Sequence, residues 1–162
     1  MEKYRKNVGI VVFNATGKVL MCARADKTDM QWQFPQGGIE TNEDIIEAAK
    51  RELWEETGIE SITFVNKMPY SLKYKFPTKI FNFFKKKGCD FIGQEQYWVL
   101  FRFDGKDEEI DFFVNPEEVE FKDFEWVSPL EAPIRIVYFK REVYKKVINF
   151  FAPIIVKAVN ND

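Results

Sequence analysis

The chain has 162 residues, a length that suits one domain over residues 1–162 with its own hydrophobic core. Hydrophobic residues make up 46% of the chain and aromatic residues 17%, which excludes an intrinsically disordered protein. The formal net charge of −2 excludes a protein that binds nucleic acids through an overall positive charge. Any recognition of phosphate must therefore be local.

The chain contains no histidine. This excludes Ser-His-Asp and Cys-His catalysis and metal sites with histidine ligands, so an enzyme of this sequence must use carboxylates, lysine, arginine, tyrosine or a metal. Two cysteines, Cys22 and Cys89, are too few for a disulfide framework, and we expect core residues there. The apolar run 8–13 is too short for a signal peptide, and no stretch has the length of a membrane span. We therefore expect a cytoplasmic protein with no membrane segment.

The first predicted elements form a β-hairpin. The apolar run 8–13 and the returning segment 18–23 are separated by turn residues at 14–17. A polar loop is expected over 24–31, and a short extended piece over 32–38 that ends in paired glycines.

A helix is predicted next. Thr41 or Asn42 can cap its amino end, Glu43 and Asp44 suit the positive end of its dipole, and Gly58 suits its carboxyl end. Later segments predict strands over 62–72, 96–103, 110–114 and 124–127, and an amphipathic helix over 140–151. Strands, hairpins and two helices together indicate an α/β or α+β sandwich.

The predicted first helix carries carboxylates at the edge of its apolar face. With roughly 100° per residue, Glu52 and Glu56 fall beside the stripe that contains Ala49 and Leu53. Glutamate pairs on a helix are usually solvated surface residues. Here Glu52, Glu55 and Glu56 would repel one another on the inward edge, and a bound cation would relieve that repulsion. Ligands that are all oxygen favour Mg²⁺, with Mn²⁺ as a substitute.

Two further features support a site at this helix. Gly37 and Gly38 permit a backbone turn that brings main-chain atoms close to a metal or phosphate. Arg51 can pair with Glu47 and Glu55 at i, i+4 spacing, which would make it a structural residue.

The segment from Gly37 to Ile59 follows the spacing G-x5-E-x7-R-E-U-x-E-E-x-G-U, where U is aliphatic. This spacing resembles the signature of the Nudix hydrolases at every fixed position. The resemblance implies the Nudix fold, a mixed β-sheet flanked by helices, and a metal-dependent hydrolase of phosphoric anhydride bonds. In that family the box glutamates, here Glu52, Glu55 and Glu56, bind the metal together with the glycine at Gly37. The glutamate and arginine that orient them correspond to Glu43 and Arg51.

The resemblance extends beyond this box to the bacterial RNA pyrophosphohydrolases, a group that overlaps the diadenosine polyphosphate hydrolases. It is carried by the strings YRKNVG near the start of the chain, WQFPQGG before the box, IGQEQYW, and FKREVY near the end. Lys6 stands where that group has proline. The implied substrate is the 5′-triphosphate or diphosphate end of RNA, and the alternative is a dinucleoside polyphosphate. A monomer is expected, and an activating protein partner is left open.

The same resemblance assigns roles outside the box. Glu120 corresponds to a further metal-binding glutamate that is also a candidate base, although a solvated acidic loop explains it equally from the residues alone. Arg5 and Arg24 correspond to contacts of the phosphate chain. Phe139 and Lys140 correspond to the end that binds the base, where an aromatic face can stack on a nucleobase; the alternative for Phe139 is a core residue.

A lysine-rich segment, 73–87, interleaves charges with aromatic residues. It could attract a polyanion to the site, with Lys75 as the first candidate for a phosphate contact. The alternative is an exposed hairpin whose lysines face water. A third reading of the whole chain, a Nudix-like sensor that binds nucleotides without catalysis, is disfavoured because all three box glutamates are present.

Overall fold

The computed structural model describes residues 2–161. Within them, eight strands form one sheet in the order β3-β2-β1-β7-β5, with β4 beside β1, β6 beside β7 and β8 beside β2. The strands are β1 Tyr4–Phe13, β2 Val19–Arg24, β3 Trp32–Gln33, β4 Gln36–Gly38, β5 Ile62–Lys67, β6 Leu72–Lys75, β7 Gly93–Phe103 and β8 Phe121–Val127. The helices are α1 Ile45–Thr57, α2 Thr78–Lys86, α3 Ala132–Arg135 and α4 Arg141–Asn160.

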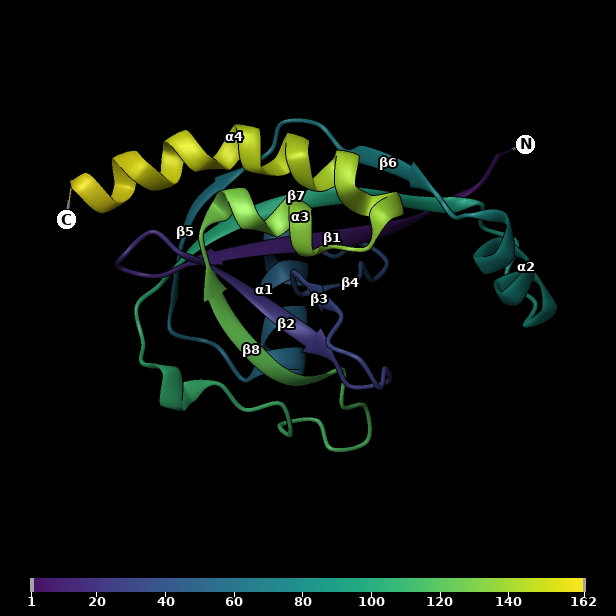
Figure 1. Ribbon diagram of the computed structural model, residues 1–162, viewed down its shortest axis with the longest axis horizontal. Coiled ribbons are helices and arrows are strands. Elements are labelled where there is room, and N and C mark those ends of the chain that lie inside the picture. Colours follow the sequence, from purple (N-terminus) through teal and green to yellow (C-terminus); the bar gives the residue numbers. More distant parts are fainter. Residues whose placement is uncertain (1, 162) are drawn as a thin grey trace.

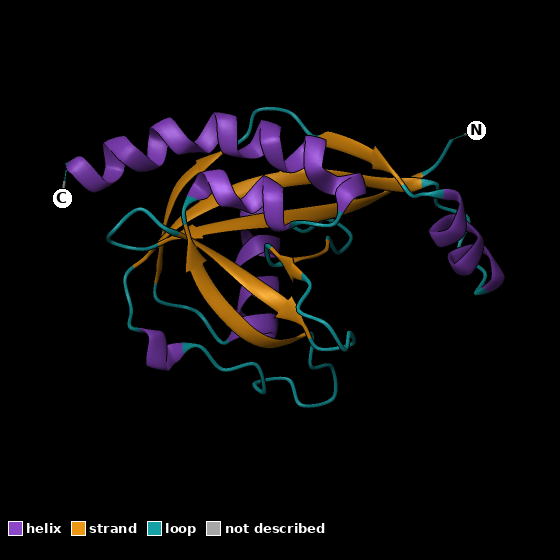
Figure 2. Ribbon diagram, viewed as in Figure 1, coloured by secondary structure: helices purple, strands orange, loops and turns teal. Residues whose placement is uncertain are grey.

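The sheet is mixed, and its centre is the parallel pair β1 and β7. The predicted hairpin is confirmed, because β1 and β2 pair in antiparallel fashion. Helix α1 lies on one face of the sheet and α4 with α3 on the other (Figures 1 and 2). Alternate side chains of β1 enter two different core clusters: Val8 and Ile10 pack with α1, and Val11 and Phe13 pack with α4. The predicted α/β sandwich with a mixed sheet flanked by helices is thus the observed architecture.

Helix α1 begins and ends at identifiable caps. Its N-cap is Asp44, whose carboxylate accepts hydrogen bonds from the amides of Ile46 at 3.0 Å and Glu47 at 3.2 Å. The prediction of Thr41 or Asn42 as the cap is therefore wrong, because these residues form the turn before Asp44. The predicted stop is confirmed: Gly58 has a φ of 73° and its N–H donates to the carbonyl of Trp54.

Two segments differ from the predictions in the second half of the chain. The predicted strand 110–114 is a loop, since its apolar side chains cover the α1 side of the core and the amide of Asp111 bonds to the carbonyl of Thr57. The lysine-rich segment forms the helix α2 after strand β6, where an exposed hairpin was the alternative. The predicted strand 62–72 divides into β5 and the start of β6.

Helix α4 is longer than predicted and extends to Asn160. No helix within residues 2–161 has both the length and the apolar character needed to cross a membrane.

Candidate active site

Strand β4 and helix α1 touch at a glycine. Gly37 pairs with Val8 of β1, which places it over the middle of the sheet. A Cβ atom at Gly37 would lie 2.0 Å from the carboxyl carbon of Glu52, so any other residue there would displace the Glu52 carboxylate from its position. The backbone of β4 and the carboxylates of α1 are therefore held against each other, as the paired glycines before the helix predict.

Glu56 is the most buried carboxylate of the helix. Its side chain lies on the inward face of α1, with the residue only 5% exposed, and its Oε1 accepts a hydrogen bond of 3.2 Å from the amide of Gln36. Burial raises the pKa of Glu56 well above its usual range, and the negative charges of Glu52 and Glu120 raise this pKa further. A buried carboxylate facing other carboxylates is a position where a cation would stabilise the ionised form.

Glu52 and Glu120 share this environment to a lesser degree. Burial raises the pKa of Glu52, and the adjacent Arg51 opposes that shift. Burial is also the largest cause that raises the pKa of Glu120, followed by the charge of Glu118. Both carboxylates line a polar cavity of about 280 Å³ together with Glu55 and Glu56. The structure thus brings together the four predicted glutamates from α1 and the loop before β8.

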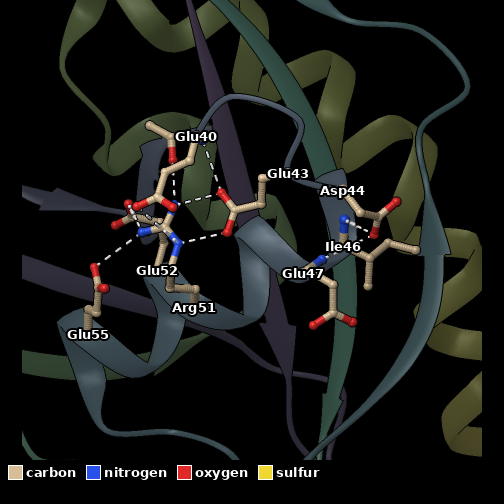
Figure 3. A network of polar contacts seen from close by, with 9 residues as sticks. Glu40, Glu43, Asp44, Ile46, Glu47, Arg51, Glu52 and Glu55 are labelled. Atoms are coloured by element: carbon tan, nitrogen blue, oxygen red, sulfur yellow. Dashed lines mark hydrogen bonds and ion pairs between the residues drawn. The ribbon is translucent and has the colours of Figure 1, made fainter.

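Arg51 holds several of these carboxylates in place (Figure 3). Its guanidinium donates to Glu43 at 2.8 and 2.9 Å, to Glu52 at 2.8 Å, to Glu55 at 3.3 Å and to the carbonyl of Gly38 at 2.9 Å. The hydrogen bond from Arg51 lowers the pKa of Glu43 to about 2.

The pairing of Arg51 with Glu47, suggested by helical spacing, does not occur, because Glu47 instead lies 3.6 Å from Lys50. Arg51 thus fixes the orientation of the site's carboxylates, so it acts on them without facing the cavity itself.

The donor set fits a hard divalent cation. The cavity is lined by carboxylates and by the backbone of Gly37 and Gly38, and it offers oxygen ligands without sulfur or imidazole. Within residues 2–161, no three acidic, cysteine or histidine side chains are already arranged as ligands around one point. Glu52 and Glu55 are turned toward Arg51 instead, and coordination would require them to rotate toward the buried Glu56.

A second cavity continues from the first. It has a volume of about 230 Å³ and shares Arg5, Gln33, Gln36, Gln94 and Glu120 with the carboxylate cavity, so the two form one cleft. Its other walls are largely aromatic and basic. They comprise Arg24, Tyr74, Phe76, Ile80, Phe84, Cys89, Phe91, Phe139 and Lys140. Cys22 is buried as predicted, but the prediction of a core position for Cys89 is wrong, because Cys89 is only partly buried and borders this cavity. Four of the five predicted substrate-binding residues therefore gather in this cleft.

The exception is Lys75. Its side chain is 63% exposed, lies 3.3 Å from Glu2, and does not line either cavity.

Lys140 and Phe139 come from the short 3₁₀ helix before α4. Lys140 is buried, and its ammonium lies 5.5 Å from the centre of the Tyr74 ring. Burial, followed by the charge of Arg24, lowers the pKa of Lys140 to about 8. Phe139 is half-buried and its ring centre lies 5.9 Å from that of Tyr74. Phe139 therefore packs against the core and also borders the cavity. This position is compatible both with a core residue and with a residue that stacks on a nucleobase.

Several residues of the cleft were not assigned from the sequence. Gln36 and Gln94 lie where the two cavities join, and Gln96 donates to Gln36 at 3.0 Å. All three stand inside the strings that carry the family resemblance, WQFPQGG and IGQEQYW, which was the available signal. Ile80 and Phe84 come from α2, and their i, i+4 spacing was the signal for a helix there.

Comparison with known proteins identifies the class. The NUDIX domain family model matches residues 3–147, which is most of the chain. The chain therefore belongs to the Nudix family, and it is a hydrolase that acts on pyrophosphate bonds. Members of this family generally require divalent metal ions.

Curated relatives match nearly the whole chain, and several of them are named RNA pyrophosphohydrolase. The chain is 40% identical over 157 residues to the RNA pyrophosphohydrolase of Bartonella henselae, covering 91% of this chain and 90% of that protein. It is 41% identical over 157 residues to the RNA pyrophosphohydrolase of Erythrobacter litoralis, covering 94% and 93%. It is also 40% identical over 153 residues to the chloroplastic Nudix hydrolase 26 of Arabidopsis thaliana, covering 93% and 70%.

Solved structures support the fold alone. The dihydroneopterin triphosphate pyrophosphohydrolase of E. coli matches with a TM-score of 0.68 at 19% identity, covering 91% of this chain and 97% of that one. An Ap4A hydrolase of C. elegans in a binary complex matches with a TM-score of 0.60 at 17% identity, covering 91% and 98%.

Proposed function

We propose that this protein is an RNA pyrophosphohydrolase, which converts the 5′-triphosphate or diphosphate end of RNA to a 5′-monophosphate. One observation carries the proposal: a single cleft joins a cluster of carboxylates at one end to arginines and aromatic rings at the other. A phosphate chain linked to a nucleoside matches that order of groups. The identity of about 40% to proteins named RNA pyrophosphohydrolase, over nearly the whole chain, supports RNA as the substrate.

In this proposal, Glu52, Glu55, Glu56 and Glu120 would hold Mg²⁺, or Mn²⁺ in its place, with the backbone of Gly37. A bound divalent cation supplies charge stabilisation and a more acidic water to a hydrolysis of this kind. Glu120 is the candidate base, because burial raises the pKa of its carboxyl group and so makes its carboxylate a stronger base toward a water proton. Glu43 and Arg51 position the carboxylates.

The other side chains bind the substrate. Arg5 lies where the two cavities join, and Arg24 lines the second cavity. Their guanidinium groups can donate hydrogen bonds to phosphate oxygens there. Phe139 offers part of its ring to a nucleobase, and the ammonium of Lys140 can donate to an acceptor on the base edge. Lys75, exposed on β6, would contact the phosphates only from outside the cavities.

We place the reaction in the cytoplasm, with the protein acting as a monomer.

The alternative substrate is a dinucleoside polyphosphate such as diadenosine tetraphosphate. The same carboxylates and arginines would serve it, and Phe139 and Lys140 would then contact adenine. The two substrates differ beyond the nucleoside that is bound at the aromatic end: a dinucleoside polyphosphate stops at that nucleoside, whereas RNA continues through its 3′-phosphate.

The test compares kcat/KM for a 5′-triphosphorylated RNA with an unpaired 5′ end and for diadenosine tetraphosphate, both with Mg²⁺. Glu56→Gln serves as the blank, and Glu47→Gln, an exposed residue of the same helix, as the matched control. A much higher kcat/KM on RNA with a 5′-monophosphate product is the expected result. Preference for the dinucleotide would contradict the proposal and assign the protein to the clearance of dinucleoside polyphosphates.

A further inference from the structure

Helix α2 differs from the other helices in its attachment to the core. No residue of α2 is buried, and the helix extends from one end of the sheet beside the amino terminus (Figure 1). Its attachment includes the ring contact between Phe84 and Phe76, whose centres are 5.2 Å apart. A helix of this length gains little stability from its own backbone, so few interactions hold α2 in place.

The two faces of α2 have different chemistry. Ile80 and Phe84 line the aromatic cavity of the cleft. On a helical wheel, Lys79, Lys85 and Lys86 fall on the opposite arc, and all three are exposed. One face of α2 therefore borders the place proposed for the first nucleosides, and the other presents positive charge to solvent.

The positive charge of α2 belongs to a segment of the chain that is rich in lysine and lacks acidic residues. Residues 67–89 contain seven lysines and no acidic residue, although the whole chain has a net charge of −2. In the described part of the chain, Lys79, Lys85, Lys86 and Lys87 form no ion pair with a carboxylate. Their ammonium groups are therefore available to an external anion.

An aromatic ring lies among these lysines. Phe83 is 54% exposed, and the ammonium of Lys87 lies 4.4 Å from the centre of its ring. Helical spacing places Lys79 and Lys86 beside Phe83 as well. An exposed aromatic ring flanked by unpaired cations is the arrangement that binds single-stranded nucleic acids, where bases stack on the ring and phosphates meet the charges.

We propose that α2 binds the RNA strand downstream of its 5′-terminal nucleotides, with the lysines on backbone phosphates and Phe83 stacked on a base. The proposal rests on the proposed function and names what distinguishes RNA from a dinucleoside polyphosphate at this site. Continuity supports it, because Phe84 and Ile80 on the same helix already border the cleft. A strand that leaves the aromatic cavity meets α2 next.

The test uses the triple variant Lys79→Gln/Lys85→Gln/Lys86→Gln. The matched control is Lys18→Gln/Lys146→Gln/Lys157→Gln, which removes the same charge from exposed positions in the β1–β2 turn and on α4. KM and kcat are measured with a 5′-triphosphorylated dinucleotide and with a longer unpaired RNA, over a range of salt concentrations. Because α2 has no buried residue, we expect circular dichroism and the melting temperature to stay close to those of the wild type.

The α2 variant is expected to raise KM for the longer RNA by about tenfold and to leave kcat and the dinucleotide unchanged. The slope of log KM against log salt should fall by about two, since each lost phosphate contact contributes roughly 0.7 on a single strand. Phe83→Ala should raise KM for the longer RNA by roughly fivefold or more, again without an effect on the dinucleotide.

Three results would overturn the inference. They are an equal change on both substrates, an equal change in the control variant, and no change on the longer RNA. Loss of binding to vesicles of anionic lipid, with RNA turnover intact, would assign α2 to a membrane surface instead.

Failure of the proposed function is distinguishable from failure of this inference. If the wild type does not hydrolyse RNA, binding of a 5′-hydroxyl RNA is measured by fluorescence anisotropy. Weaker binding by the α2 variant would then support α2 as an RNA-binding element, and unchanged binding would refute it.

Discussion

At the carboxylate end of the cleft, Glu52 and Glu56 rise from a helix packed on the centre of the sheet, and a glycine of β4 touches one of them. At the aromatic end, Ile80 and Phe84 come from a helix with no buried residue. The first end is fixed by the same contacts that stabilise the fold. The α2 side of the second end can change its residues at little cost in stability, whereas the carboxylates of the first end cannot.

The largest expected effect comes from Glu56→Gln at the fixed end. Removing this negative charge is expected to lower kcat by roughly 10³-fold, the scale of losing a charge-stabilising group from an active site. The fold should be kept or become more stable, because the buried carboxylate is costly and a glutamine Oε1 can still accept from Gln36. Turnover is compared with thermal melting, and Glu47→Gln is the control. Near-wild-type turnover would contradict the proposed metal site.

An intermediate effect is expected from Arg51→Gln. Glu43, Glu52 and Glu55 would lose the group that orients them, so kcat should fall by about 10- to 100-fold and the melting temperature should also fall. Lys50→Gln, on the same helix and near Glu47 alone, is the matched control. A change confined to KM would show that Arg51 binds substrate instead of positioning the carboxylates.

The smallest expected effect is a pH dependence at the aromatic end. The pKa of Lys140 is about 8 in the folded protein, so kcat/KM should fall severalfold as pH rises through 8, and Lys140→Met should lack this decline. Arg24 and Tyr74 are the groups that face this ammonium. A decline of the same size in Lys140→Met would assign it to another group.

The free energy of unfolding should rise with pH over the range in which kcat/KM falls. Because the pKa of Lys140 is lowered from 10.5, the unfolded chain binds more protons between pH 8 and pH 10.5, and the free energy of unfolding rises across this window. Lys140→Met should therefore be more stable than the wild type below pH 8, by up to about 3 kcal/mol, and the difference should shrink as pH rises. Chemical denaturation of both proteins at several pH values measures it.

The contrast between the two ends also explains what could be predicted from the sequence. The carboxylate helix was predictable because a fixed spacing and a helical wheel place Glu52 and Glu56 at the apolar edge, and burial of Glu56 confirms that edge. The cap was missed because Asp44 was only one of several capping residues in sequence. Residues 110–114 were predicted as a strand because apolar residues that cover a core as a loop have the same composition.

Helix α2 was missed for a different reason. The segment is short and no side chain caps the amino end of its helix, so its helical spacing was masked by the lysines, and the hairpin alternative was equally consistent with the charges. The cleft itself depends on side chains far apart in the chain, such as Gln36 with Gln94 and Arg24 with Lys140, and only the folded sheet brings them together.

The weak attachment of α2 has a consequence for motion. An element without buried side chains opens at a lower free energy than the strands of the core, so amide hydrogens of α2 should exchange with solvent much faster than those of β1 and β7. Local opening of α2 would move Ile80 and Phe84 away from one side of the aromatic cavity without disturbing Glu56 or Arg51. A long strand could thus enter or leave sideways, and its whole length need not thread past the site of cleavage.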